Sequence, residues 1–215
     1  ATDVQAAIDE LAASGGGGAP AECIIDLGLS VGGQYIETSN SCKTAKNTAG
    51  GGAVQVLSHQ FFGGDGGKYY FEVVADNVAS PVNWGAGVVT RSYAIRFSIV
   101  AGHYVGSSVN DFGLWAHGKK ITAGGATGSF PTISAGDVIG VAVDTTAGSI
   151  WWAINGAWVE GDPAAGTTPS YTDYRLKSHL HMYVTPYGLD AQCTIRGLSG
   201  EFTESIPTGF VAACD

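Results

Sequence analysis

The clearest structural signal in the sequence is Gly136-Asp137-Val138-Ile139-Gly140-Val141-Ala142-Val143-Asp144, an apolar run that begins and ends in turn residues. A second such run, Ser149 to Ile154, follows after Thr145-Thr146-Ala147-Gly148, so the two runs predict a β-hairpin. Asn155-Gly156 comes next. Because both central residues of a type I′ turn need positive φ, this pair predicts a tight turn that returns the chain into Ala157-Trp158-Val159.

Outward from this hairpin, the chain from residue 21 onward is a succession of short runs rich in Val, Ile, Tyr, Phe and Trp. Clusters of Gly, Asn, Asp and Ser separate these runs, a pattern typical of strands and turns. Short, frequent strands without intervening helices predict an all-β sandwich or barrel. The further strands that we expect are 68–74, 84–90, 93–100, 112–116, 180–185, 191–196 and 209–213.

The segment 136–144 resembles the GD-x-IGV-x-x-D strand of SPRY domains, and its hairpin resembles theirs in ending with Asn-Gly. Other pieces resemble the family's segments in the same order: Lys68-Tyr69-Tyr70-Phe71-Glu72-Val73, Gly85-Ala86-Gly87-Val88, Phe112-Gly113-Leu114-Trp115, His117-Gly118-Lys119-Lys120 and Pro207-Thr208-Gly209-Phe210. The resemblance spans residues 55–213 and implies an antiparallel, two-sheet, concanavalin-like β-sandwich. The stretch 151–166 resembles phage-encoded members in particular.

The N-terminal segment is predicted to be a short α-helix that joins copies of the chain. Ala1, Val4, Ile8 and Leu11 form an apolar stripe at helical spacing. Residues 3–11 also resemble a segment that precedes the receptor-binding head in phage tail and fibre proteins. We therefore expect an oligomerising helix at 1–14, a glycine-rich linker at 15–20, a β-sandwich head at 21–215 and a homotrimer held through Val4, Ile8 and Leu11. The alternative is a helix that lies on its own domain.

The composition places the chain among globular proteins. Of its 215 residues, 45% are hydrophobic and only 13% are charged, which is unlike a disordered chain. The formal net charge of −9 disfavours a partner with a phosphate backbone, so no nucleic acid is expected. Since no apolar run approaches the ~18 residues of a membrane span, membrane insertion is not expected. No signal peptide is recognisable at the front.

Four cysteines lie far apart, at positions 23, 42, 193 and 214, and no CxxC pair exists to suggest a zinc site. Two disulfides or four buried thiols both fit this pattern. The SPRY resemblance implies that the first and last strands lie close together. On that ground we expect a Cys23–Cys214 bond first and a Cys42–Cys193 bond second.

Several motifs suggest catalysis, and none of them predicts it well. The segment 28–32 matches G-x-S-x-G, but no helical pattern follows, so a turn is expected. His179 and His181 share a strand face without a nearby third metal ligand, so no metal or other cofactor is expected. No Glu-x-Asp-x-(x)-Glu strand is present, and turn capping is the simpler role for Asp137 and Asp144. We expect a protein that is not an enzyme.

The aromatic residues, 5 Trp, 9 Tyr and 8 Phe, are the more informative set for binding. Trp151 and Trp152 must face opposite sides of their strand. Aromatic side chains in loops, next to polar groups, suit sugar binding. The predicted ligand-binding residues are Trp115, His117, Trp158, Tyr171, Tyr187 and Asp190. Trp158 is expected near a hairpin tip, with little burial by its own sheet, while at least half of the aromatics are expected in the core.

Together these features predict a non-enzymatic fibre or spike protein on the surface of a phage virion, assembled in the host cytoplasm. Its sandwich head would bind a bacterial surface polysaccharide. Each single site would bind weakly, and the several copies of the head on one virion would raise the overall affinity. Two alternatives remain open. One is a structural capsid decoration or fibre-connector protein whose head contacts other virion proteins, and the other is a capsule depolymerase.

Overall fold

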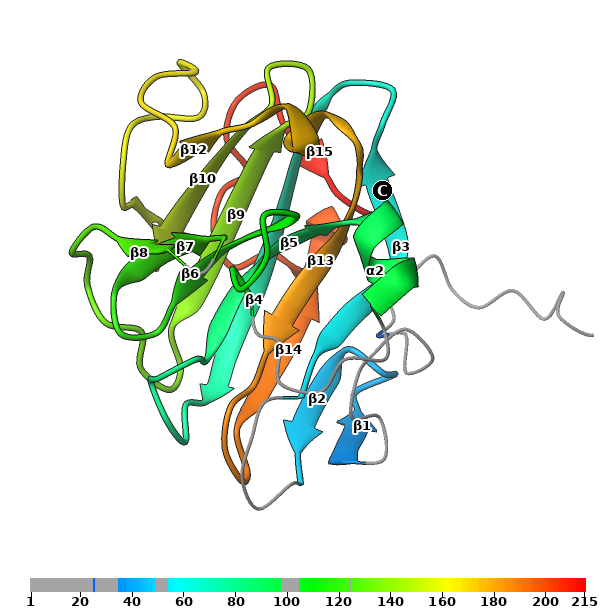
Figure 1. Ribbon diagram of the computed structural model, residues 1–215, viewed down its shortest axis with the longest axis vertical. Helices are drawn as coiled ribbons and strands as arrows, with labels where there is room; N and C mark the ends of the chain where they lie inside the picture. The colour runs from blue at the N-terminus through cyan, green and yellow to red at the C-terminus, as the bar shows by residue number, and fades with distance from the viewer. Residues whose placement is uncertain (1–24, 26–34, 49–53, 98–104, 124) are drawn as a thin grey trace, which may run out of the picture.

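The structure is a computed structural model that describes Ile25 and residues 35–48, 54–97, 105–123 and 125–215. Two β-sheets lie face to face, as the sequence predicts (Figure 1). The larger sheet has the order β1 (Ile36–Ser39), β2 (Thr44–Asn47), β14 (Gln192–Arg196), β4 (Lys68–Asn77), β9 (Val138–Asp144), β10 (Ser149–Ile154) and β11 (Ala157–Trp158). In addition, β12 (Tyr171–Thr172) pairs with β10, and β15 (Val211–Ala212) pairs with β4 in parallel.

The smaller sheet has the order β3 (Val56–Gly63), β13 (His179–Thr185), β5 (Gly85–Thr90), β6 (Asp111–Trp115), β7 (Lys119–Thr122) and β8 (Gly125–Thr127). Three helical elements have described bounds: α2 (Arg91–Phe97) and the short 3₁₀ turns η2 (Tyr174–Lys177) and η3 (Ser199–Glu201). None of the described helices is long and apolar enough to cross a membrane. The predicted β-sandwich is therefore confirmed.

The predicted β9–β10 hairpin forms in the register that its sequence indicates. Ser149 pairs with Asp144 and Ile154 pairs with Ile139. Asn155 and Gly156 have φ values of 49° and 75°, the double positive φ that a type I′ turn requires. The Asn155 side chain also accepts a hydrogen bond from the Val138 N–H at 2.8 Å, which holds the turn against the start of β9.

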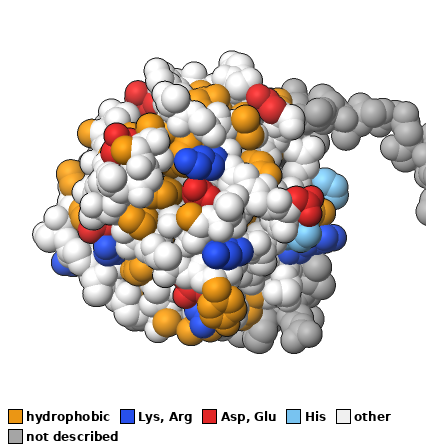
Figure 2. All heavy atoms as spheres, turned by 90° about the horizontal axis from the view of Figure 1, so that it is seen from above, with side chains coloured by type: hydrophobic (Ala, Val, Ile, Leu, Met, Phe, Trp, Pro, Cys, Tyr) orange, Lys and Arg blue, Asp and Glu red, His pale blue; other side chains and the backbone are white. Residues whose placement is uncertain are grey.

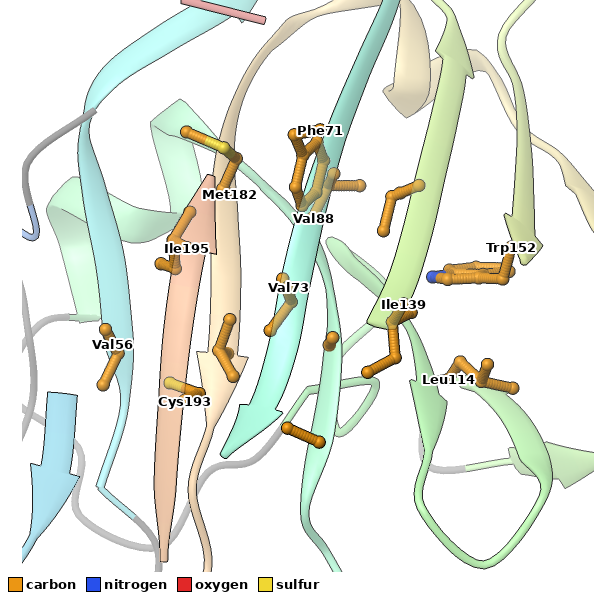
Figure 3. Close-up of a cluster of buried hydrophobic side chains, with 14 of the residues drawn as sticks. Val56, Phe71, Val73, Val88, Leu114, Ile139, Trp152, Met182, Cys193 and Ile195 are labelled. Atoms are coloured by element: carbon orange, nitrogen blue, oxygen red, sulfur yellow. The ribbon is translucent and has the colours of Figure 1, made fainter. Parts of the chain in front are cut away.

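Strand alternation divides the hairpin between the core and the outer face of the larger sheet. Ile139, Val141, Val143, Ile150, Trp152 and Ile154 enter the main core between the sheets. Figure 3 shows Trp152 and Ile139 there, with Leu114 of the facing sheet. Trp151 and Ala142 belong instead to a cluster on the outer face with Phe210. The two adjacent tryptophans therefore point to opposite sides, as predicted.

The outer face of the larger sheet is covered by a C-terminal segment that we name the strap, residues 198–210. Its Phe202, Ile206 and Phe210 pack on the outer cluster around Tyr70 and Trp151. This cover explains why every residue of β9 and β10 is buried, although one face of that sheet lies away from the core.

The strand expected at 93–100 is wrong: residues 91–97 form α2 instead. β5 ends at Thr90, and the chain there leaves the sheet for its outer face. Tyr93 and Ala94 pack on a small cluster with Val89 and Tyr183 of the smaller sheet. Packing on this apolar face overrides the alternating pattern, which is a weak local preference.

The second predicted disulfide is also wrong, because Cys42 and Cys193 are free. Cys193 lies opposite Ala45 and faces the core, and the Ile195 N–H bonds to the Lys43 carbonyl. Cys42 instead lies in the turn that precedes β2, with a φ of 61°, and is not paired with Cys193. Cys214 is disulfide-bonded, whereas its predicted partner Cys23 lies outside the described residues, so that pairing stays a prediction.

The N-terminal predictions lie outside the described residues. They comprise the helix at 1–14 with Val4, Ile8 and Leu11, the linker at 15–20 and the G-x-S-x-G turn at 28–32.

Candidate functional site

A pocket of about 370 Å³ opens on the outer face of the larger sheet, between the strap and the β10–β11 edge. We name it the Trp158 pocket. The sheet side contributes Tyr70, Ala153, Gly156 and Trp158, while the strap contributes Glu204, Ser205, Ile206, Pro207 and Thr208. The volume lies in the range of small-ligand sites, and the wall combines aromatic, apolar, hydroxyl and carboxylate groups.

Small residues on the outer side of β9 and β10 make room for the aromatic side chains beside this pocket. Gly140 and Ala153 pair across the hairpin, so their positions lie side by side. A Cβ atom on Gly140 would lie 2.6 Å from the Tyr70 hydroxyl oxygen, which shows that the tyrosine ring occupies this space. The Tyr70 and Trp158 rings then meet edge to face, with centroids 6.4 Å apart.

Trp158 is half-buried, which corrects the expectation that its position beside the turn would leave it free of its own sheet. From β11, Trp158 pairs with Ala153 of β10. This pairing brings the Trp158 ring over the outer face of the sheet, where it packs against the Tyr70 ring. Trp158 is thus both a pocket wall and a packing residue.

Glu204 supplies the charge of the pocket. A Cβ atom on Gly156 would lie 2.5 Å from Glu204 Oε2, so the carboxylate lies directly against the Asn155-Gly156 turn. In the part of the chain that the structure describes, no Lys, Arg or His forms an ion pair with Glu204, and none lines the pocket. The Glu204 carboxylate is therefore available to a ligand.

Tyr70 lies beneath two carboxylates. Its hydroxyl donates to Glu72 Oε1 at 3.3 Å. Burial, followed by the negative charges of Glu72 and Glu204, raises the pKa of Tyr70 far above its ordinary value, so the hydroxyl remains a neutral donor. The floor of the Trp158 pocket is consequently electronegative.

Glu72 of β4 anchors the strap that forms one wall of the pocket. Its side chain is fully buried, and it accepts the N–H groups of Thr203 at 2.9 Å and Glu204 at 2.8 Å. Arg196 Nη1 lies 3.2 Å from Glu72 Oε2 and balances its charge. Since these contacts fix the backbone of residues 203 and 204, Glu72 is a positioning residue for the pocket.

Four other predicted ligand residues gather at one end of the sandwich, which we name the loop end (loops 78–84, 116–118 and 186–190). The Trp115 and His117 rings have centroids 5.1 Å apart, and His117 Nδ1 lies 3.4 Å from the Pro81 carbonyl oxygen. Tyr187 packs partly on the core, and Asp190 pairs with Lys46 at 2.7 Å. The β4 and β13 arrowheads point toward this end (Figure 1).

Tyr171 lies apart from both groups. It belongs to β12, and its ring packs between Phe112 and Trp152 at the open side of the sandwich, with centroids 5.9 and 6.1 Å away. Lys120 lies over the same ring and also pairs with Glu160. Tyr171 is therefore a packing residue at the sandwich edge, and the structure does not bring it to the predicted ligand site.

The candidate catalytic groups are engaged in structural roles. Asp137 and Asp144 cap turns by accepting backbone N–H groups, as the sequence analysis suggests. His181 is buried, with Nδ1 at 2.8 Å from the Ser58 carbonyl oxygen, and the Phe61 ring lies beside both His179 and His181. Among the described residues, no three His, Cys, Asp or Glu side chains gather in a way that could hold a metal ion.

Charge on the surface is sparse. Figure 2, which looks down on the molecule of Figure 1, shows Lys and Arg side chains as isolated groups rather than as a basic cluster.

Sequence reasoning missed Glu72 and Glu204, two important residues around the pocket. Glu72 could have been noticed as a lone carboxylate within the apolar run Tyr69 to Val74, because buried charges are rare and need partners. No local signal identifies Glu204, since its place beside Trp158 depends on the path of the strap.

The fold is similar to those of several solved structures, two of which are SPRY domains. The SPRY domain of human HERC1 matches with a TM-score of 0.57 and 16% identity over 80% of this chain and 96% of that one. A human SPRY domain matches with a TM-score of 0.57 and 17% identity over 75% of this chain and 94% of its own length. Stonustoxin matches with a TM-score of 0.57 and 18% identity over 81% of this chain and 27% of that protein.

These identities establish a shared fold, and no curated protein matches the chain. The family model for the SPRY domain matches residues 68–182, more than half of the sequence. The matched region runs from the start of β4 to the middle of β13 and contains the whole β9–β10 hairpin. On this ground, together with the two-sheet architecture, the chain belongs to the SPRY family.

Proposed function

We propose that this chain is the non-enzymatic head of a phage fibre or spike and that it binds a bacterial surface glycan in the Trp158 pocket. The observation that carries the proposal is the Glu204 carboxylate, which has no ion-pair partner among the described residues and lines a pocket together with the Trp158 ring. Sugar recognition uses these two elements, since apolar C–H faces stack on aromatic rings while hydroxyl groups donate to carboxylates.

The remaining wall suits the same ligand class. Ser205 and Thr208 bring hydroxyl groups, and Ile206 and Pro207 bring apolar surface. The phage setting and the trimer are supported by the N-terminal resemblance alone. If three heads share one fibre, a weak single site suffices because the linked copies raise the effective concentration.

The test is binding of the full chain to an immobilised glycan array. We expect at least one bacterial polysaccharide to bind, and Trp158→Ala to weaken that binding about 3- to 10-fold, the range of an aromatic contact. Tyr174→Ala is the matched control, because Tyr174 is a strongly exposed aromatic remote from the pocket. Equal binding by wild type and Trp158→Ala, at equal folded fraction, would contradict the proposed site.

Release of oligosaccharide from a bound polysaccharide would instead favour the depolymerase alternative. This readout is taken in the same experiment, from the supernatant of the array incubation.

The loop end favours a second candidate function, contact with other virion proteins. Val82 and Leu189 are 54% and 52% exposed, and their loops are neighbours because Gly188 lies beside Ala79 and Ser80. Exposed apolar side chains next to partly buried aromatics are typical of protein interfaces. A Val82→Ser and Leu189→Ser double variant that still binds glycan but fails to enter particles would support this second function.

A further inference from the structure

We propose that the Trp158 pocket selects sugars that carry a free, protonated amino group, such as deacetylated hexosamines. This inference rests on the proposed glycan-binding function and names its ligand class. It follows from the balance of charge inside the pocket rather than from the aromatic wall alone.

The first argument is the charge of the lining. Glu204 is the one carboxylate among the described residues that line the pocket, and no basic side chain accompanies it there. The other nearby acid, Glu72, is already balanced by Arg196 and saturated by backbone N–H groups. A bound ligand therefore meets one uncompensated negative charge, which an ammonium group neutralises and a neutral hydroxyl group does not.

The second argument is the place of that charge. Glu204 is half-buried, and its carboxylate lies directly against the Gly156 backbone in the pocket that Tyr70 also lines; its charge helps to raise the pKa of Tyr70. Partial removal from water strengthens a charged hydrogen bond over its value in bulk solvent. An ammonium group at this point donates to the carboxylate and lies close to the electron-rich rings of Trp158 and Tyr70, a favourable cation–π arrangement.

The third argument excludes the opposite class. A sugar carboxylate, sulfate or phosphate would enter beside Glu204 without any cation in the lining to receive it. The net charge of −9 adds a general repulsion of anionic polymers. Acidic capsular sugars are therefore expected to bind poorly.

The experiment compares the glucosamine trimer with the N-acetylglucosamine trimer by titration calorimetry of the full chain at pH 6, where the amine is protonated. We expect the free amine to bind about 10-fold more tightly, and Glu204→Gln to abolish this preference; the N-acetylated trimer should weaken only about 2- to 3-fold, because its hydroxyl group still donates to the amide oxygen without the help of a charge. Trp158→Ala should weaken both ligands. The control Glu37→Gln removes an equal charge from an exposed site and should keep the preference.

The outcomes separate this inference from the glycan-binding proposal. Equal affinity for the two trimers, or a preference that survives in Glu204→Gln, would overturn the amine selectivity. Trp158-dependent binding of any neutral glycan on the array would then still uphold the proposed function. A chain that binds no saccharide, on the array or in titration, would overturn both.

Discussion

The Glu72 carboxylate accepts the backbone N–H of Glu204 at 2.8 Å, although the two residues are 132 positions apart in the chain. This bond joins β4 to the strap on the outer face of the larger sheet. The second carboxylate oxygen accepts the neighbouring Thr203 N–H at 2.9 Å. A single buried side chain thus fixes the backbone of residues 203 and 204 on the sheet, and with it part of one wall of the Trp158 pocket.

Glu72→Gln should destabilise the protein and weaken ligand binding together. The amide N–H₂ group would face a backbone N–H donor, and Arg196 would lose its anion. Hydrogen bonds to charged groups contribute about 1.5–3 kcal/mol each, so we expect a loss of about 2–4 kcal/mol in the free energy of unfolding. Urea titration measures this loss.

The control for that variant is Asp65→Asn, a change of the same chemistry at an exposed turn residue. It should alter the free energy of unfolding by less than about 0.5 kcal/mol. Equal stability of Glu72→Gln and Asp65→Asn would show that the strap does not depend on Glu72.

Asp111 should make stability fall as the pH rises from about 4 to about 8. Burial raises the pKa of Asp111 to about 8, although the Ser108 and Gly106 N–H groups oppose this shift. In the unfolded chain the carboxyl ionises near its ordinary pKa of 3.8, so between these values the folded state retains a proton that the unfolded state has lost. The stabilisation is complete below pH 3.8 and disappears as the pH passes 8.

The measurement is the melting temperature at pH 5 and pH 8 for wild type and Asp111→Asn. The variant cannot ionise at this position, so its melting temperature should fall less over this interval. Parallel pH dependences for the two proteins would refute a buried, protonated Asp111.

The thiols should react in two classes under non-reducing conditions. Cys42 is partly exposed and should be alkylated in the folded protein. Cys193 is buried, and burial raises its pKa above the ordinary value, so it should react only after unfolding. Peptide mass spectrometry should find these two modified residues and an unmodified Cys214. Four alkylated thiols would contradict the disulfide at Cys214.

Removal of residues 1–18 should lower the molecular mass of the oligomer that this chain forms in solution. The stripe Ala1, Val4, Ile8 and Leu11 is the predicted trimer contact, and two heptads are too short to remain helical alone. Light scattering should give a trimer for the full chain and a monomer for the shortened one. If the shortened chain remains a trimer, the contacts that hold the trimer lie in the head, and the predicted role of the N-terminal helix is wrong.

The β9–β10 hairpin could be predicted from the sequence almost residue by residue, because its information is local. Apolar alternation specifies which side chains face the core, and Asn155-Gly156 specifies the next turn, between β10 and β11, through its backbone conformation. The same local reasoning failed at α2, where alternation resembles a strand and packing against Val89 and Tyr183 prevails. Local pattern is weakest where a short segment can satisfy either period.

The candidate site divides along the same line. Trp158 could be proposed from the sequence because its distance from the turn is a local quantity. Its half-burial against Tyr70 could not, since the two residues meet only when β4 and β10 join the same sheet on either side of β9. The six predicted ligand residues do not form one group in the structure. Trp158 lines the pocket, Tyr171 lies at the sandwich edge and the other four lie at the loop end, because the segments that carry them leave the sheets at different places.

Composition, alternation and turn residues thus specify an all-β chain, its central hairpin and the family that the hairpin indicates, because these depend on contacts within about twenty residues. The path of the strap, the state of the cysteines and the neighbours of Glu204 depend on contacts between residues far apart in the chain. Such contacts form where hydrogen bonds, charge and side-chain volume are satisfied together in three dimensions. Glu72 and Glu204 show the difference, because their hydrogen bond cannot be predicted from either local sequence and forms only when the strap lies across the sheet.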